Sequence, residues 1–131
     1  CLSARADSTK LKSFIVFSAA KRKRKKLNED FRYKCVVTSS SKAWMNEELT
    51  LNLVKSVLGA FSFNRRLLAW DSYECHMMKS VKEALHQINV NQVIVPGGRT
   101  KYVQAPDVSW NKPFKALLSE KYDEWMASGV Q

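Results

Sequence analysis

Residues 67–71, Leu67-Leu68-Ala69-Trp70-Asp71, form a short apolar run that ends in a carboxylate. A second apolar run, Val93-Ile94-Val95, follows and is stopped by Pro96-Gly97-Gly98. Between the two runs, apolar residues recur at helical spacing near positions 78–87. A helix between two short buried strands is typical of a parallel crossover unit. The sequence therefore predicts an α/β fold with Asp71 at the carboxyl end of a strand.

The residues before position 67 predict further elements of the same fold. Residues 1–20 predict a β-hairpin, because turn-forming residues separate two segments of β-forming residues. Cys35-Val36-Val37-Thr38 predicts a short strand. Residues 46–60 carry an apolar stripe at helical spacing, with Asn46 suited to the N-cap and Gly59 to the helix end.

The last apolar stripe predicts a C-terminal helix. Its apolar positions fit the helical period: Phe114, Leu117, Leu118, Tyr122, Trp125 and Met126. Pro113 lacks an N–H and is tolerated near a helix start, so Asp107 is expected just before this helix or in a kinked first turn. Because the hairpin adds antiparallel strands to parallel crossovers, we expect a mixed sheet flanked by helices. The length predicts a single domain over residues 1–131.

The charge balance predicts a polyanionic partner. The 131 residues include 22 Lys and Arg against 12 Asp and Glu, a formal net charge of +10. Such a surface releases counterions when it binds phosphates, so nucleic acid is the expected partner. No apolar run approaches the roughly twenty residues of a membrane helix, and we expect no membrane association. Three irregularly spaced cysteines give no disulfide framework and fit a reducing compartment.

One basic tract stands apart from the rest of the charge. It consists of six consecutive cations: Lys21, Arg22, Lys23, Arg24, Lys25 and Lys26. Dense like charges repel one another, which favours a solvated loop at 21–26. Such a tract serves as a nuclear localisation signal, as a phosphate-contacting arm, or as a loop with no dedicated role, and the sequence leaves these alternatives open.

Two aspartates are candidates for a metal site. Ligands of open α/β sheets bind beyond the carboxyl ends of parallel strands, where Asp71 is expected. Asp107 follows the next strand, so both carboxylates can face one cleft. Carboxylate oxygens suit Mg²⁺ or Mn²⁺, and a pair of such ions can stabilise both oxygens of phosphodiester cleavage. Spacing alone does not assign this role, because aspartates at strand ends are more often solvated or capping residues.

Three local motifs make the prediction more specific. They are Trp44-Met45-Asn46-Glu47-Glu48-Leu49, then Leu67-Leu68-Ala69-Trp70-Asp71 with His76, then Gln104-x-x-Asp107 leading into Asn111-Lys112-Pro113-Phe114-Lys115. In this order the chain resembles the catalytic domain of pogo/Tigger-like transposases, in the DDE transposase (mariner-like) superfamily. The resemblance covers nearly the whole chain.

The resemblance implies an RNase H-like fold in which three acids hold two metal ions. It places the second acid on Asp71 and the third on Asp107. The family's first acid lies on a central strand that precedes the equivalent of Cys1-Leu2-Ser3-Ala4. We expect this strand to be missing from the sequence, and because the first residue is Cys1 rather than Met, we expect a fragment, a processed product or a partial gene model. The family's usual Gln-Pro-Leu-Asp is here Gln104-Ala105-Pro106-Asp107, which keeps the acid and changes the turn before it.

Residues around the two acids are candidate DNA contacts. His76 matches a family position, and its expected role is to contact DNA, to orient Asp71, or to make a local structural hydrogen bond. Four basic residues surround Asp107 and are expected to contact phosphates: Arg99, Lys101, Lys112 and Lys115. Trp70, Trp110 and Trp125 lie beside apolar runs and are expected in the core.

Three functional hypotheses follow from the resemblance. The first is part of a nuclear transposase that cuts and joins DNA and depends on magnesium or manganese. A homodimer is a possible state of the full-length protein in this hypothesis. The second is a domesticated, non-catalytic DNA- or chromatin-binding module, and the third is a translated remnant. Two carboxylates offset the mutual repulsion of two dications poorly, so residues 1–131 alone are expected not to cleave DNA.

Overall fold

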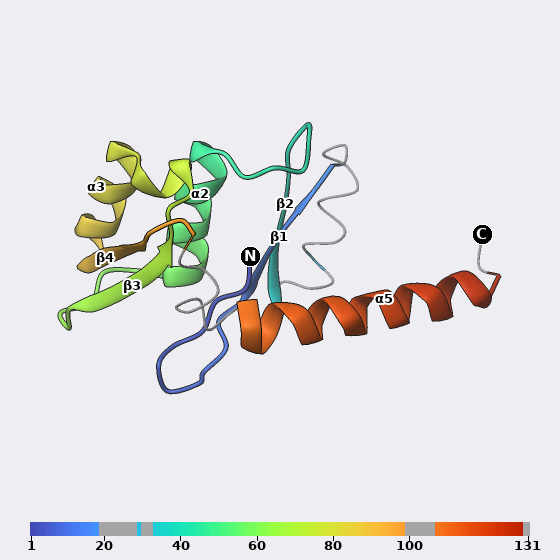
Figure 1. The fold of residues 1–131 in the computed structure, drawn as a ribbon. Coiled ribbons are helices and arrows are strands. Elements are labelled where there is room, and N and C mark those ends of the chain that lie inside the picture. Colours follow the sequence, from blue (N-terminus) through green and yellow to red (C-terminus); the bar gives the residue numbers. More distant parts are fainter. Residues whose placement is uncertain (19–28, 30–32, 99–106, 130–131) are drawn as a thin grey trace. The chain divides into compact units, whose positions relative to one another are not determined.

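The computed structural model describes residues 1–18, 29, 33–98 and 107–129 (Figure 1). The chain divides into two compact units, Cys1–Val95 and Pro96–Gln131. Short parallel strands and helices make up the first unit, and the described part of the second consists mainly of a long helix. The predicted α/β class is therefore confirmed, and the single domain over 1–131 stays a prediction.

The first two strands pair in parallel. Strand β1 (Ser13–Phe17) lies beside β2 (Cys35–Ser39), with Ser13 opposite Cys35 and Phe17 opposite Ser39. The chain before β1 folds back on itself through one antiparallel bridge, Ala4 to Lys10. The predicted hairpin is thus present as a turn with a single bridge.

The helix predicted over 46–60 is present in two parts. The α-helix α2 (Glu47–Leu53) continues directly into a π-helical turn, η1 (Val54–Leu58). Asn46 is the N-cap, and its Oδ1 accepts a hydrogen bond of 2.8 Å from the Leu49 N–H. Gly59 ends the segment at φ 80°, a conformation that glycine adopts without strain. The predicted cap and stop signals are confirmed.

Loss of this cap has a measurable consequence. Replacing Asn46 with alanine is expected to cost about 1 kcal/mol, because the Leu49 N–H loses its acceptor. Hydrogen exchange at the Leu49 amide should accelerate about fivefold. Asn52→Ala on the exposed side of the same helix is the matched control. Equal exchange at Leu49 in both variants would show that the cap contributes nothing.

The predicted crossover unit is confirmed. Strand β3 (Arg66–Asp71) leads through a 3₁₀ turn, η2 (Glu74–Met77), and helix α3 (Lys79–Gln87) to strand β4 (Val90–Val95). The two strands are parallel, and their register places Asp71 opposite Val95.

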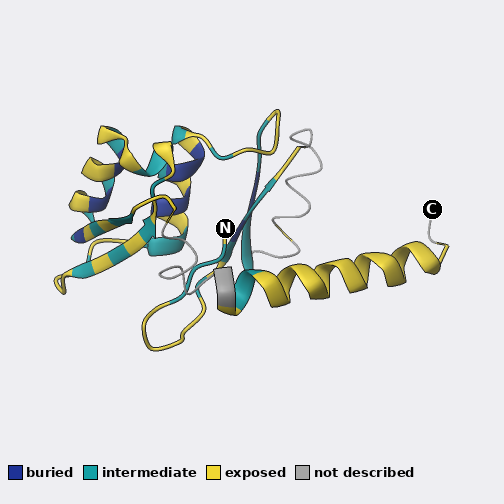
Figure 2. Ribbon diagram, in the orientation of Figure 1, coloured by how far each residue is buried: buried dark blue, intermediate teal, exposed yellow. Residues whose placement is uncertain are grey.

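Two apolar clusters form the core of the first unit (Figure 2). The first consists of Val54, Val81, Leu85 and Val90, and the second of Phe14, Leu49 and Leu53. The continuous α2–η1 segment contributes to both clusters, with Val54 in the first and the two leucines in the second. This segment therefore couples the β1–β2 pair to the β3–β4 crossover unit.

The expected single mixed sheet is not what the described residues form. Their strands make two separate two-stranded sheets, β1–β2 and β3–β4, and both are parallel. No described strand bridges the two pairs, and the α2–η1 segment packs with each instead.

The second unit contains the predicted C-terminal helix. A π-helical turn, η3 (Asp107–Asn111), runs directly into α5 (Lys112–Ala127), with Pro113 in the first turn. Asp107 is the first residue of η3 and thus lies just before α5, as expected. The apolar stripe of α5 is exposed rather than buried, and Trp125, expected in the core, is 50% exposed. Within the described ranges, no helix is long and apolar enough to cross a membrane.

Candidate active site

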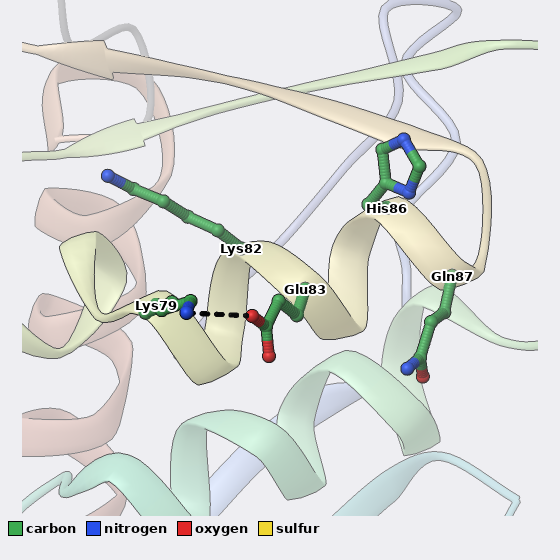
Figure 3. A pocket seen from close by; sticks show the side chains of 5 residues that line it. All are labelled: Lys79, Lys82, Glu83, His86 and Gln87. Atoms are coloured by element: carbon green, nitrogen blue, oxygen red, sulfur yellow. Dashed lines mark ion pairs between the residues drawn. The ribbon is translucent and has the colours of Figure 1, made fainter.

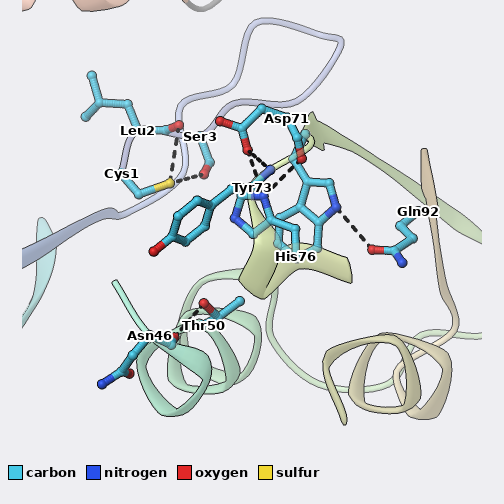
Figure 4. Close-up of polar contacts among 10 residues, drawn as sticks. Cys1, Leu2, Ser3, Asn46, Thr50, Asp71, Tyr73, His76 and Gln92 are labelled. Carbon is cyan, nitrogen blue, oxygen red and sulfur yellow. Dashed lines mark hydrogen bonds and ion pairs between the residues drawn. The ribbon is translucent and has the colours of Figure 1, made fainter. Parts of the chain in front are cut away.

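Asp71 lies at the carboxyl end of β3, with its side chain 52% exposed. Two donors converge on one carboxylate oxygen, Oδ1: the ring Nδ1 of His76 at 2.8 Å and the Tyr73 N–H at 3.3 Å (Figure 4). No hydrogen bond from a described residue reaches the second oxygen, Oδ2. The carboxylate is thus held by one oxygen and offers the other to a ligand.

His76 is fixed by contacts on several sides. Its Nδ1 lies 2.8 Å from the Asp71 carboxylate and 3.2 Å from the Asp71 backbone oxygen. Both neighbours are acceptors, so Nδ1 carries a proton. One face of the imidazole stacks on Trp70 with ring centroids 3.9 Å apart and planes 4° apart, and the Tyr73 ring meets it edge-on. His76 thus makes a local hydrogen bond to Asp71, and this bond also orients the Asp71 carboxylate. Both were among the roles expected of His76.

Tyr73 anchors the turn that carries His76. Its hydroxyl donates a hydrogen bond of 2.9 Å to the backbone oxygen of Met45, in the segment before α2. A hydrogen bond with Cys75 raises the pKa of the Tyr73 hydroxyl, which keeps it protonated as a donor. A second link joins the starts of α2 and α3, where Ser80 Oγ donates to the Glu47 carboxylate.

The donor set around Asp71 fits one ligand of a hard dication. An exposed carboxylate with a free oxygen is the ligand type that Mg²⁺ and Mn²⁺ prefer. Among residues 1–18, 29, 33–98 and 107–129, no three His, Cys, Asp or Glu side chains are grouped to hold a metal. Asp71 is therefore a suitable ligand but not a complete site.

The other predicted site residues have different outcomes. Asp107 begins η3 in the second unit, but its side chain lies outside the described set, so the shared pocket with Asp71 stays a prediction. Lys112 and Lys115 are exposed in the first turn of α5, in the same unit as Asp107. Arg99, Lys101 and the tract 21–26 fall outside the described residues.

A shallow depression lies along α3 (Figure 3). It is lined by Lys79, Lys82, Glu83, His86 and Gln87, with Lys79 Nζ 3.7 Å from Glu83 Oε1. Every lining residue belongs to one helix, so functional groups from different elements do not converge there.

Residues of the site that sequence reasoning missed are Tyr73 and Gln92. Trp70 was expected to be purely a core residue. It does pack against the first core cluster, and it also stacks on His76. The sequence signal was the spacing Trp70-Asp71-x-Tyr73-x-x-His76, in which residues with ring side chains lie on both sides of Asp71.

The fold and site define an α/β protein with an exposed acid at a parallel strand end. Residues 1–130 match the family model described as DDE superfamily endonuclease, and the chain belongs to this family. The resemblance to pogo-like DDE domains is confirmed by two curated relatives.

Both relatives are called "Pogo transposable element with KRAB domain". The protein from Mus musculus is 32% identical over 90 residues, and that from Homo sapiens is 31% identical over 90 residues. Each alignment covers 66% of this chain and 15% of the relative, so the chain spans only a small part of their length. No solved structure matches the chain.

Proposed function

We propose that this chain is part of a transposase domain of RNase H-like architecture that cuts and joins DNA with Mg²⁺ or Mn²⁺. Asp71 and Asp107 hold the metal. The observation that carries the proposal is the Asp71 carboxylate, which is exposed at a parallel strand end, fixed through Oδ1 and free at Oδ2. Membership of the endonuclease family supports the same chemistry.

The metal supplies charge stabilisation at the attacking and leaving oxygens of the phosphodiester. The contribution of this chain is to present oxygen ligands: Oδ2 of Asp71 and the carboxylate of Asp107. Two carboxylates are too few negative charges for two adjacent dications. A further acid from elsewhere in the full-length protein completes the set. A strand that joins the β1–β2 and β3–β4 pairs would supply it and complete one mixed sheet.

DNA binding rests on charge. The net charge of +10 favours a phosphate-rich partner. Lys112 and Lys115 are exposed and lie close to Asp107 in the sequence. Both are in the first turn of α5, which directly follows η3. In this proposal they contact phosphates beside the cut, together with Arg99, Lys101 and His76. The tract 21–26 directs the protein to the nucleus, and the full-length protein acts as a homodimer.

The DNA-binding part is tested by salt dependence. In the full-length protein, replacing Lys112 and Lys115 with glutamine should reduce the slope of log affinity against log salt by about 2, since each phosphate contact contributes about 0.9. Lys121→Gln is the matched control, because Lys121 is on the same helix and pairs with Glu124 at 2.6 Å. An unchanged slope in the double variant would remove both lysines from the DNA interface.

A further inference from the structure

A second pair of residues, Trp70 and Gln92, supports the Asp71–His76 pair. His76 stacks on Trp70, and Trp70 is hydrogen-bonded to Gln92. Successive side chains of a strand point to opposite faces, so Trp70 lies on the covered face of β3 while Asp71 lies on the exposed one. The indole packs against the cluster of Val54, Val81, Leu85 and Val90. One edge of its ring is thereby held by the core.

A hydrogen bond across the sheet fixes the other edge of the indole. Trp70 Nε1 donates to Gln92 Oε1 on β4 at 3.1 Å. Gln92 faces Leu68 in the parallel register, two positions from the residue opposite Trp70, so the bond runs diagonally between the strands. Rotation of the indole about its χ angles would break this bond, and the ring plane is therefore defined.

The imidazole of His76 stacks directly on this indole ring. The imidazole lies parallel to the indole, with centroids 3.9 Å apart and planes 4° apart. A flip of the imidazole about χ2 would place a carbon where Nδ1 now faces Asp71 Oδ1. A turn of the ring out of the plane would lose the stack. The indole therefore fixes the plane of the imidazole, and within that plane the bond to Asp71 Oδ1 selects the orientation in which Nδ1–H faces the carboxylate.

We propose that Trp70 and Gln92 are positioning residues that set the orientation of His76 and, through it, which carboxylate oxygen of Asp71 is free for metal. The effect on metal binding at Asp71 rests on the proposed function. The geometric part, from Gln92 to His76, is independent of any metal. Trp70 thus has a role beyond filling the core.

The metal-free part is tested by NMR of full-length protein with isotope-labelled histidine rings, assigned with His76→Gln. In the parent protein, His76 should be the Nδ1–H tautomer, with ring protons shifted upfield by the stacked indole. Trp70→Leu, which stays apolar but removes the stacked ring and with it the upfield shift, should mix the tautomers. Gln92→Leu should change both signals in the same direction, whereas Gln92→Glu keeps an acceptor and should restore them.

The metal consequence is tested by calorimetric titration with Mn²⁺ and no DNA. Trp70→Leu and Gln92→Leu should weaken Mn²⁺ binding by up to about 10–100-fold, the usual effect of removing a direct partner of a metal ligand, because they act on Asp71 through His76. Asn91→Leu, on the exposed side of β4 beside Gln92, is the control and should bind as the parent does. Backbone amide spectra establish that each variant is folded.

The outcomes separate this inference from the proposed function. A parent-like His76 tautomer, ring shift and Mn²⁺ affinity in folded Trp70→Leu or Gln92→Leu would overturn the positioning role and leave Trp70 as a core residue. If Asp71→Asn leaves Mn²⁺ binding unchanged, the proposed metal site fails. In that case the tautomer and ring shift still decide whether Trp70 and Gln92 position His76.

Discussion

Replacing Asp71 with asparagine in the full-length protein is expected to lower metal-dependent DNA cleavage by ~10²–10³-fold, the scale on which loss of one transition-state-stabilising group reduces enzyme rates. Asparagine keeps the size of the side chain but removes the charge that a dication requires. The amide also disturbs the hydrogen bond from His76 Nδ1, because its nitrogen is a donor. DNA affinity should stay close to that of the parent protein, since the basic residues are unchanged.

Cleavage of a labelled DNA duplex and equilibrium binding to the same duplex measure the two effects separately. Asp123→Asn, which removes an exposed carboxylate from α5, is the control for the loss of one charge. Parent-like cleavage by Asp71→Asn would remove Asp71 from the active site. A parent protein that binds DNA with strong salt dependence but never cuts it would establish the non-catalytic binding module instead.

Replacing Arg66 with methionine is expected to lower the stability of the first unit by about 2–3 kcal/mol. The Arg66 guanidinium donates to three backbone oxygens, those of Leu58 at 2.7 Å, Ala60 at 3.0 Å and Ile88 at 2.7 Å. It thereby joins the end of the α2–η1 segment to the end of α3, where backbone oxygens lack partners within the helix.

The size of this effect follows from charge-assisted hydrogen bonds. Each bond to a charged group contributes about 1.5–3 kcal/mol. Arg66 is partly exposed, which lowers the total contribution of its three hydrogen bonds. Its Nε is buried and has no partner among the described residues, which lowers the net stabilisation further. Arg66→Lys should keep part of the stability, since one ammonium cannot reach all three oxygens.

Hydrogen exchange of the β3 and β4 amides measures the loss within the full-length protein. A change of about 2–3 kcal/mol corresponds to roughly 30–150-fold faster exchange where the unit must open. Arg65→Met is the matched control, because Arg65 precedes Arg66 and is exposed. If both methionine variants exchange at the same rate, Arg66 does not hold the helix ends together.

Local patterns predicted the elements of this fold well. The helical period from Asn46, the cap residue itself and the crossover unit from Arg66 to Val95 are all present as expected. Each depends on residues close in sequence, whose spacing and turn chemistry are visible directly. The π-helical turns η1 and η3 left no signal, because their residues have the same apolar spacing as an ordinary helix.

Strand pairing could not be predicted in the same way. The parallel pairing of β1 with β2 and the division into two sheets depend on contacts between distant segments. The α2–η1 segment illustrates this, because its apolar residues serve two clusters and the sequence shows only one broad stripe. Exposure of the α5 stripe is likewise invisible in the spacing of its residues.

The site was predictable only where a motif marked it. Asp71 and His76 were expected from the resemblance, and the structure brings their side chains together. Tyr73 was missed because its contacts depend on how the chain turns back after the end of β3, and Gln92 because its bond to Trp70 depends on the pairing of β3 with β4. Asp107 remains a prediction as the second metal ligand.

The most direct test of a shared metal site is iron-directed cleavage of the polypeptide backbone. Fe²⁺ replaces Mg²⁺ in the full-length protein, and hydroxyl radicals formed at the bound iron cut the chain close to it. We expect two sets of fragments, with ends near residues 71 and 107, and we expect Asp71→Asn to lose both. Cuts near one of these positions without the other, or near neither, would contradict a metal site that Asp71 and Asp107 share.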